Sequence, residues 1–178
     1  MPDRSITYRP ATPFDAPRIA ALHTRSWQEN YRGDLPDHYL DQEASGERLA
    51  IWTDRFSLPN PNMHVMLAES DNRLVGFCCL FLHHHPDDGA LLDNLHVRHD
   101  MQGVGVGRRL IRWAAVTTLA DDPAGRLYLW VLKTNTRAAA VYTHIGGRLG
   151  RTERQHIVPG QPTGVEAVAV HFSAEELI

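Results

Sequence analysis

The chain has 178 residues, of which 43% are hydrophobic and 22% charged, and its formal net charge is −3. A chain of this length buries a sizeable core, and its slight negative charge argues against a broad surface for nucleic acid. No apolar run approaches the roughly 20 residues of a membrane span. Residues 1–4 also lack the apolar core of a signal peptide, so we expect a cytoplasmic protein that binds neither nucleic acid nor membrane.

The N-terminal part of the chain predicts one strand and two helices. Residues 5–9 alternate as a short strand does. Asp15 is the expected cap of the first helix, because a cap there places Pro17 in the first turn, where no helical hydrogen bond is lost. A second helical stretch runs over residues 37–56 and is interrupted near Ser45-Gly46.

The rest of the chain alternates strands with helices. Apolar runs on either side of a short polar turn predict a hairpin of residues 64–70 and 74–82. The run over 126–132 is too apolar for an edge and predicts a central strand. The further expected elements are a strand over 90–98, helices over 103–119 and 136–145, and closing strands over about 148–158 and 165–172. We therefore expect a single mixed α/β domain over residues 5–174.

Neither the cysteines nor the histidines predict a metal site. Cys78 and Cys79 are neighbours in a predicted strand, and two adjacent cysteines form neither a disulfide framework nor a cysteine-rich zinc site. We expect both to be reduced core residues. In the run 83–85, three consecutive histidines of an extended chain alternate sides, so at most two of them can share an ion.

A loop with three glycines is the most informative segment. It follows the strand over 90–98 and leads directly into an amphipathic helix. Backbone N–H groups at such a helix start lack helical partners and favour a bound pyrophosphate. Glycine at Gly103, Gly105 and Gly107 lets an anion approach the backbone, and we expect Arg108 and Arg109 to add positive charge beside it.

Two other nucleotide loops fit these residues poorly. A P-loop would end in Gly-Lys-Ser/Thr, whereas Gly107 is followed by two arginines. A dinucleotide loop starting at Gly103 would have glycine or alanine at position 108 and an acid after the next strand, which ends at Leu132 and Lys133. A tight strand-to-helix connection without a ligand remains the alternative.

Two blocks of the chain resemble the GNAT superfamily of N-acetyltransferases. The pattern Gln102-x-x-Gly105-x-Gly107 after a strand is similar to the family's acetyl-CoA pyrophosphate loop. A strand over 127–132, followed by Asn135, Tyr142 and Ile145-Gly146, is similar to a second family segment, although Gly147 stands where the family usually has an aromatic residue. The resemblance implies a twisted, mostly antiparallel sheet of about seven strands, with a splay between the fourth and fifth strands and about four flanking helices.

The resemblance also implies an acetyl-CoA-dependent reaction without a metal, in which a primary amine attacks the thioester directly. The pantetheine arm would fill the splay and pair with the backbone of Leu95, His96 and Val97, whose N–H groups would stabilise the oxyanion. Asn135 would cap its helix or touch the pantetheine arm. The residues that would hold the pyrophosphate are Gln102, Gly103, Val104, Gly105, Val106, Gly107 and Arg108.

The catalytic groups are less well defined by the sequence. Tyr142 is the candidate proton donor for the departing thiolate, and a packing aromatic is the alternative. Relatives often place an acid where Leu91 stands, so Asp93, on the same strand face, is the candidate base. The side chain of His96 should point to the opposite face. A base that acts through ordered water, or an acceptor amine that is already neutral, stays an open alternative.

Nothing in the sequence selects the acceptor beyond a small-molecule or peptide amine. Aromatic and acidic residues gather in the first helical region, a combination that suits a cationic amine but is also ordinary for a solvated helix. These residues are Trp27, Glu29, Tyr31, Asp34, His38, Tyr39 and Asp41. A non-catalytic module of the same fold that binds acyl-CoA as a sensor is the alternative function, and a homodimer is common in the family.

Overall fold

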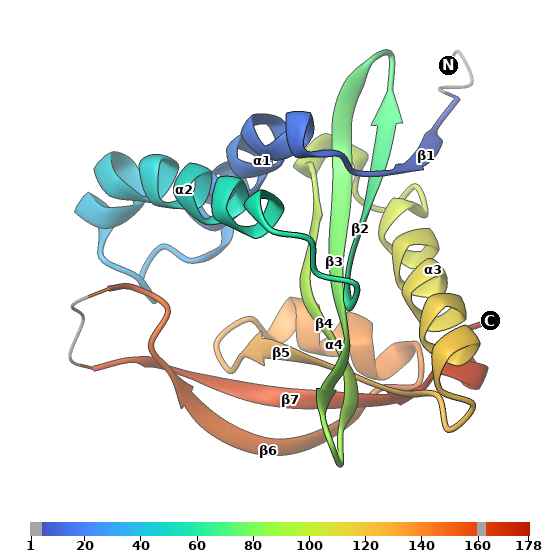
Figure 1. The fold of residues 1–178 in the computed structure, drawn as a ribbon. Coiled ribbons are helices and arrows are strands. Elements are labelled where there is room, and N and C mark those ends of the chain that lie inside the picture. Colours follow the sequence, from blue (N-terminus) through green and yellow to red (C-terminus); the bar gives the residue numbers. More distant parts are fainter. Residues whose placement is uncertain (1–4, 160–162) are drawn as a thin grey trace. The chain divides into compact units, whose positions relative to one another are not determined.

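The computed structural model describes residues 5–159 and 163–178, so the expectation on residues 1–4, that they are not part of a signal peptide, lies outside the described residues. The strands are β1 (Thr7–Pro10), β2 (Met63–Ser70), β3 (Arg73–His85), β4 (Gly89–Val97), β5 (Arg126–Leu132), β6 (Arg148–Gln155) and β7 (Val165–Ser173). The helices are α1 (Ala16–Asn30), α2 (Ala44–Ser57), α3 (Val106–Asp121) and α4 (Thr136–His144). The strands form one seven-stranded sheet in the order β1-β2-β3-β4-β5-β7-β6 (Figure 1).

The sheet is mostly antiparallel, as the resemblance implied. Antiparallel pairing joins β1 to β2, β5 to β7 and β7 to β6, whereas β4 pairs in parallel with β5. The chain divides into two compact units. The first unit contains the residues up to Leu80 together with Asn94–Ile111, and the second contains Phe81–Asp93 and Arg112–Ile178. The single domain over 5–174 stays a prediction.

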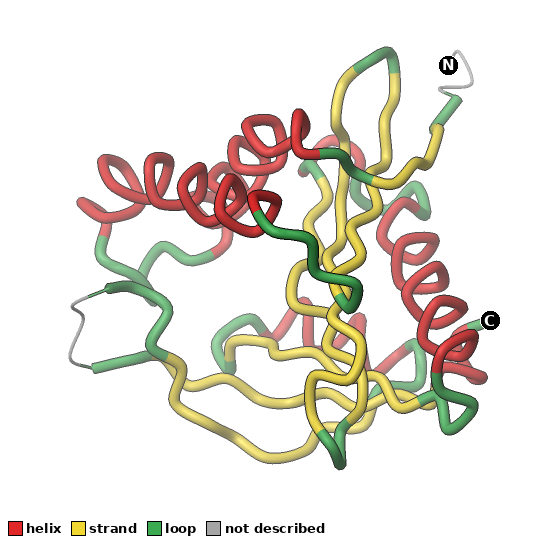
Figure 2. The backbone as a smooth tube through the Cα atoms, viewed as in Figure 1, coloured by secondary structure: helices red, strands yellow, loops and turns green. Residues whose placement is uncertain are grey.

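The first unit contains α1 and α2, which lie side by side (Figure 1). Asp15 stands at the N-cap position of α1 and Pro17 in its first turn, as predicted, although the side chain of Asp15 makes no capping hydrogen bond to this helix. The hairpin of β2 and β3 is also confirmed, with a short turn between its two strands (Figure 2). Asp71 and Asn72 form that turn with φ values of +51° and +59°, a conformation that aspartate and asparagine tolerate better than most residues.

The second helical stretch differs from its prediction. A wide π-helical turn, Tyr39–Glu43, precedes α2, and Ser45 and Gly46 lie inside the first turn of that helix. The predicted interruption at Ser45-Gly46 is therefore wrong. The irregular turn places Tyr39 and Leu40 in the core at 2% and 1% exposure, and burial of this apolar surface explains why the backbone departs from a regular helix there.

The second unit is built around β5. This strand pairs with β7 along its whole length, from Arg126 opposite Ser173 to Leu132 opposite Ala167, so the predicted central strand is confirmed. β6 forms the exposed edge. Cys78 and Cys79, in the first unit, are fully buried and form no disulfide among the described residues. No helix among the described residues is long and apolar enough to span a bilayer.

Candidate functional site

The glycine loop between β4 and α3 has an unusual backbone. Gly103 has a φ of +80° and Gly105 a φ of +90°, values that cost a residue with a side chain roughly 1 kcal/mol or more. Because a right-handed helix requires negative φ values, α3 cannot begin before these glycines end. It begins at Val106, later than the predicted start of the helix over 103–119.

Buried residues hold both ends of the loop in place. Met101 is 4% exposed before it, and Val106 is 1% exposed after it. At Gly76 on β3, a Cβ atom would lie 3.0 Å from a methyl group of Val106 and 3.2 Å from the carbonyl oxygen of His96. The close packing of β3 against the start of α3 therefore depends on a glycine at position 76.

The first turn of α3 offers backbone donors to an anion. Its first helical hydrogen bond runs from the N–H of Arg109 to the carbonyl of Gly105, at 3.0 Å. The N–H groups of Val106, Gly107 and Arg108 precede that bond and have no intrahelical partner. Together with the helix dipole, they favour a phosphate group at this end of α3.

The loop is open on the side where an anion would approach. Apart from the glycine itself and its two chain neighbours, no atom of the described residues lies within 4 Å of the position that a Cβ would take at Gly103 or Gly105. The side-chain amide of Gln102 donates to the carbonyl of Val97 at 3.3 Å, which ties the loop back to β4. The loop is thus anchored at its ends and accessible along its glycines, which suits a pyrophosphate.

The two arginines after the loop have different surroundings. Arg108 is exposed. The guanidinium of Arg109 instead lies 4.6 Å from the ring centroid of Tyr8, on β1. A guanidinium keeps its positive charge in such a cation–π contact, so the expectation that both arginines add charge beside the loop stays a prediction.

The end of β4 presents its side chains in alternate directions. The strand is half-exposed from Asp93 to Val97, a stretch that includes Leu95. A methyl group of Val97 would lie 3.7 Å from a Cβ on Gly107, so Val97 faces α3. His96 faces α1, where its Nδ1 lies 2.8 Å from the hydroxyl of Ser26. The backbone expected to pair with pantetheine thus carries a histidine on one face.

A second histidine, which sequence reasoning missed, packs against His96. His23 is 2% exposed, and its ring centroid lies 4.5 Å from that of His96. Its Nδ1 accepts a hydrogen bond from the indole N–H of Trp52 at 3.1 Å. The spacing of four residues from Ile19 to His23, and again from His23 to Trp27, was the signal that places it on the buried face of α1.

Both imidazoles are held in the neutral form. Burial and the charge of Arg48 lower the pKa of His96 to about 4. Burial, the neighbouring His96 and two arginines lower the pKa of His23 well below its ordinary value. At pH 7 the two rings therefore act as hydrogen-bonding groups without charge.

The second unit carries Asp93, Asn135 and Tyr142. Asp93 is half-buried on β4. The side-chain oxygen of Asn135 accepts the N–H of Ala138 at 3.1 Å, so this residue caps α4. Tyr142 is half-buried, and its ring meets that of Phe172 edge-on with 6.4 Å between centroids. The ring of Tyr142 is therefore fixed by packing.

The glycine that replaces the family's aromatic residue has a structural reason. A Cβ at Gly147 would lie 2.7 Å from the carbonyl oxygen of Tyr142 and 2.8 Å from the ring of Phe172. The N–H of Gly147 donates to that same carbonyl at 2.9 Å. The chain leaves α4 so tightly that no side chain fits there.

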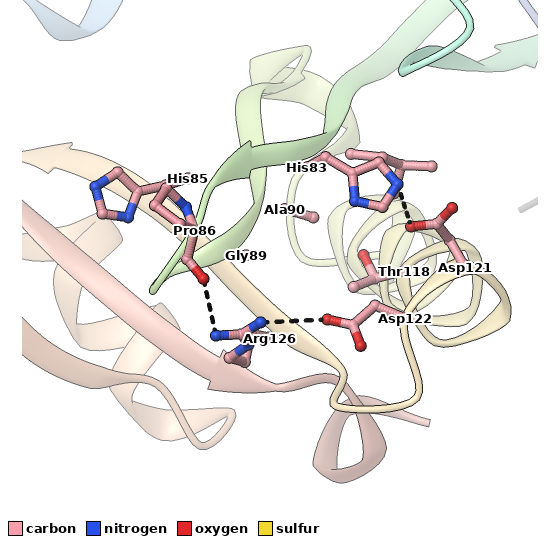
Figure 3. Close-up of a pocket in the computed structure, with 10 residues that line it drawn as sticks. His83, His85, Pro86, Gly89, Ala90, Thr118, Asp121, Asp122 and Arg126 are labelled. Atoms are coloured by element: carbon pink, nitrogen blue, oxygen red, sulfur yellow. Dashed lines mark hydrogen bonds and ion pairs between the residues drawn. The ribbon is translucent and has the colours of Figure 1, made fainter.

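The consecutive histidines have separate partners. His83 and His85 both line a pocket of about 140 Å³ in the second unit, and Figure 3 shows their rings pointing in different directions. His83 pairs with Asp121 at 3.0 Å, and His85 lies 3.3 Å from a carboxylate oxygen of Asp88. No three His, Cys, Asp or Glu side chains of the described residues come together as a metal site would need.

Comparison with known proteins identifies the family. A family model described as "Acetyltransferase (GNAT) family" matches residues 18–146. The chain belongs to the GNAT family. This GNAT chain is 28% identical over 155 residues to "Probable N-acetyltransferase Rv2775" of Mycobacterium tuberculosis, which covers 83% of this chain and 85% of that one. This chain is therefore an N-acetyltransferase, as the resemblance implied.

Two further GNAT comparisons agree. Mycothiol acetyltransferase of Jonesia denitrificans is 40% identical over 104 residues, which cover 58% of this chain and 32% of that one. The PaiA N-acetyltransferase of Thermoplasma acidophilum, solved in complex with coenzyme A, superposes with a TM-score of 0.72. It is 17% identical and covers 94% of this chain and 99% of that one, so it supports the fold.

Proposed function

We propose that this GNAT enzyme takes its acetyl group from acetyl-CoA and transfers it to a primary amine by direct attack in a ternary complex. The observation that carries the proposal is the open glycine loop before α3, whose N–H groups and helix dipole suit a pyrophosphate. The coenzyme A bound to the Thermoplasma relative supports the same donor.

The donor would be held mainly through backbone groups. The pyrophosphate would lie against the loop from Gln102 to Arg108, in which the N–H groups of Val106, Gly107 and Arg108 have no intrahelical partner. The pantetheine arm would extend the half-exposed end of β4 by pairing with the backbone of Leu95, His96 and Val97. Asn135 would add a contact to the pantetheine arm beside its role as a cap.

The reaction would form one bond and break one. The amine nitrogen attacks the thioester carbonyl, the C–N bond forms, and collapse of the tetrahedral intermediate breaks the C–S bond. Backbone N–H groups near Leu95 and His96 would stabilise the oxyanion, an effect of about 3–4 kcal/mol per donor. Asp93 would accept the proton that the amine loses, and Tyr142 would supply one to the departing thiolate.

A thiol-release assay with the full chain tests this function. The panel contains polyamines, free amino acids, an aminoglycoside, and peptides with a free N-terminus or a lysine, each with acetyl-CoA. We expect stoichiometric release of free CoA and of one acetylated amine, detected by mass spectrometry. A folded sample that acetylates none of these amines would contradict the proposal.

A further inference from the structure

Two buried donors lie in the first unit beside the proposed acetyl position. His23 accepts the indole N–H of Trp52 at its Nδ1, so its single ring proton is on Nε2. That Nε2 is buried and has no hydrogen-bond partner among the described residues. A buried N–H without an acceptor costs about 1–3 kcal/mol, which makes this atom a strong candidate for contact with a ligand.

Arg48 supplies the other donor. It is 7% exposed, and its guanidinium lies 4.2 Å from the ring centroid of Trp27, against which the ring of His23 also packs at 5.0 Å. One terminal nitrogen of Arg48 donates to Glu47 at 2.8 Å. Within the described part of the chain, its buried Nε has no partner. His23 and Arg48, which carry the two unpaired donors, therefore both contact the indole ring of Trp27.

Charged side chains lie near these donors. Arg48 and Arg55 both lower the pKa of His23, and Glu47 offsets only part of their charge through its bond to Arg48. His23 and His96 add no charge because they are neutral. Two buried N–H donors, one of them on a guanidinium, favour an anionic oxygen, and a carboxylate is the common group of that kind.

Two of the aromatic residues in the first helical region, Trp27 and Tyr39, have polar or charged partners within the chain. The guanidinium of Arg48 covers Trp27, and that of Arg55 lies 4.9 Å from the ring centroid of Trp52. The hydroxyl of Tyr39 bonds to Glu47. The chain's own arginines thus take the cation–π positions at Trp27 and Trp52.

We propose that His23 and Arg48 bind a carboxylate of the acceptor, so that the acceptor is an amino-acid-like molecule with an amine and a carboxylate. The inference rests on the proposed function, because it places the reacting amine beside His96. The backbone of His96 would meet the thioester, while its ring packs on His23. An acceptor anchored through its carboxylate at His23 would therefore hold its amine near the acetyl carbon.

The test compares matched acceptors with the wild-type enzyme. Each of the twenty amino acids is assayed beside its carboxamide, which keeps the amine and side chain and removes the negative charge. We expect at least one amino acid whose kcat/KM exceeds that of its amide by tenfold or more, since a charge-assisted bond contributes more than a neutral one. If every amide is acetylated with the same kcat/KM as its acid, the inference is wrong, while the proposed acetyl transfer still stands.

Variants assign the preference to the two donors. His23→Asn keeps an oxygen near Nδ1 for Trp52 but loses the Nε2 donor, whereas His23→Gln keeps a donor near Nε2. We expect His23→Asn and Arg48→Lys to lower kcat/KM for the acid about tenfold and to spare the amide. His23→Gln should retain the preference, and Arg32→Gln, which changes an exposed arginine of the same region, should leave it unchanged.

Two further results would decide the inference: variants that keep the preference for acids, and an enzyme that acetylates no amine. A preference for acids that survives in both His23→Asn and Arg48→Lys would overturn the assignment, because the donors would then bind internal water only. If no amine is acetylated, the proposed function fails, and calorimetric titration of the CoA-saturated enzyme with the same acids and amides decides the inference. Heat from an acid and none from its amide would support it, and equal or absent heats would overturn it.

Discussion

At the residue scale, Tyr142 has two roles that can be tested apart: its ring packs, and its hydroxyl group is the proposed proton donor. Its ring is fixed edge-on against Phe172, and its backbone carbonyl accepts the N–H of Gly147. The ring contact gives the residue a structural reason to be aromatic, which phenylalanine would satisfy equally well. Only the hydroxyl group is specific to tyrosine, so its removal tests the proposed proton donor without disturbing the packing.

We therefore predict that Tyr142→Phe lowers kcat while the affinity for acetyl-CoA changes little. A positioned general acid contributes about 10²–10⁴-fold to rate, and loss of the hydroxyl should cost a factor in that range. Turnover is measured by thiol release and affinity by calorimetry with CoA. An unchanged kcat would assign Tyr142 to packing alone.

At the scale of elements, an ion-pair network joins β1, α1 and β2. The carboxylate of Asp15 accepts two hydrogen bonds from Arg9, at 2.7 and 2.8 Å, and further ones from the backbone N–H and hydroxyl of Thr12. Arg9 and Arg18 also bond to Glu69 on β2, at 2.9 and 2.7 Å. The cap of α1 thus doubles as the centre of a three-element junction.

The network predicts an acid-labile contribution to stability. Hydrogen bonds from Arg9 hold the pKa of Asp15 well below its ordinary value of about 3.9. A lowered pKa contributes stability that is present above about pH 4 and is lost as the pH falls further. We expect Asp15→Asn to lower the free energy of unfolding by about 2 kcal/mol at pH 7 and to weaken its dependence on pH below 4.

Urea unfolding from pH 7 down to pH 2 measures both effects. Asp54→Asn changes an exposed aspartate of α2 and serves as the matched control, which should follow the wild-type profile. Parallel profiles for wild type and Asp15→Asn below pH 4 would show that the junction does not carry the acid sensitivity.

At the scale of the whole molecule, local signals predicted most elements. The apolar run over 126–132 predicted β5 to its ends, and Asp15 with Pro17 predicted the start of α1. The predicted start of α3 was wrong because apolar spacing continues through Gly103 and does not report φ. Positive φ values become visible only in the folded backbone.

The sequence predicted only the part of the candidate site that is continuous along the chain. Its loop is a continuous segment, so its glycines could be recognised along the chain. The partners of His96 could not, because Ser26 and His23 come from α1, far away in sequence, and meet it only in the folded first unit. The splay between β4 and β5 stays a prediction.

Ligand binding gives a prediction for the whole molecule. A ligand at one hundred times its dissociation constant stabilises the native state by about 2.7 kcal/mol, which raises the Tm of a chain of this size by roughly 5–10 °C. We expect acetyl-CoA to produce such a shift in scanning calorimetry. ATP and NAD⁺ should leave the Tm unchanged, because the loop lacks the lysine and the acid that their usual sites contain.

Two glycine variants show whether the shift comes from the loop. Gly105→Val forces a branched side chain onto a φ of +90° and into the open face of the loop, so it should abolish most of the shift. Gly46→Ala lies in the first turn of α2 with open space around it, and it should keep the shift and raise stability by up to about 1 kcal/mol. If acetyl-CoA stabilises Gly105→Val as strongly as the wild type, the donor binds elsewhere on the molecule.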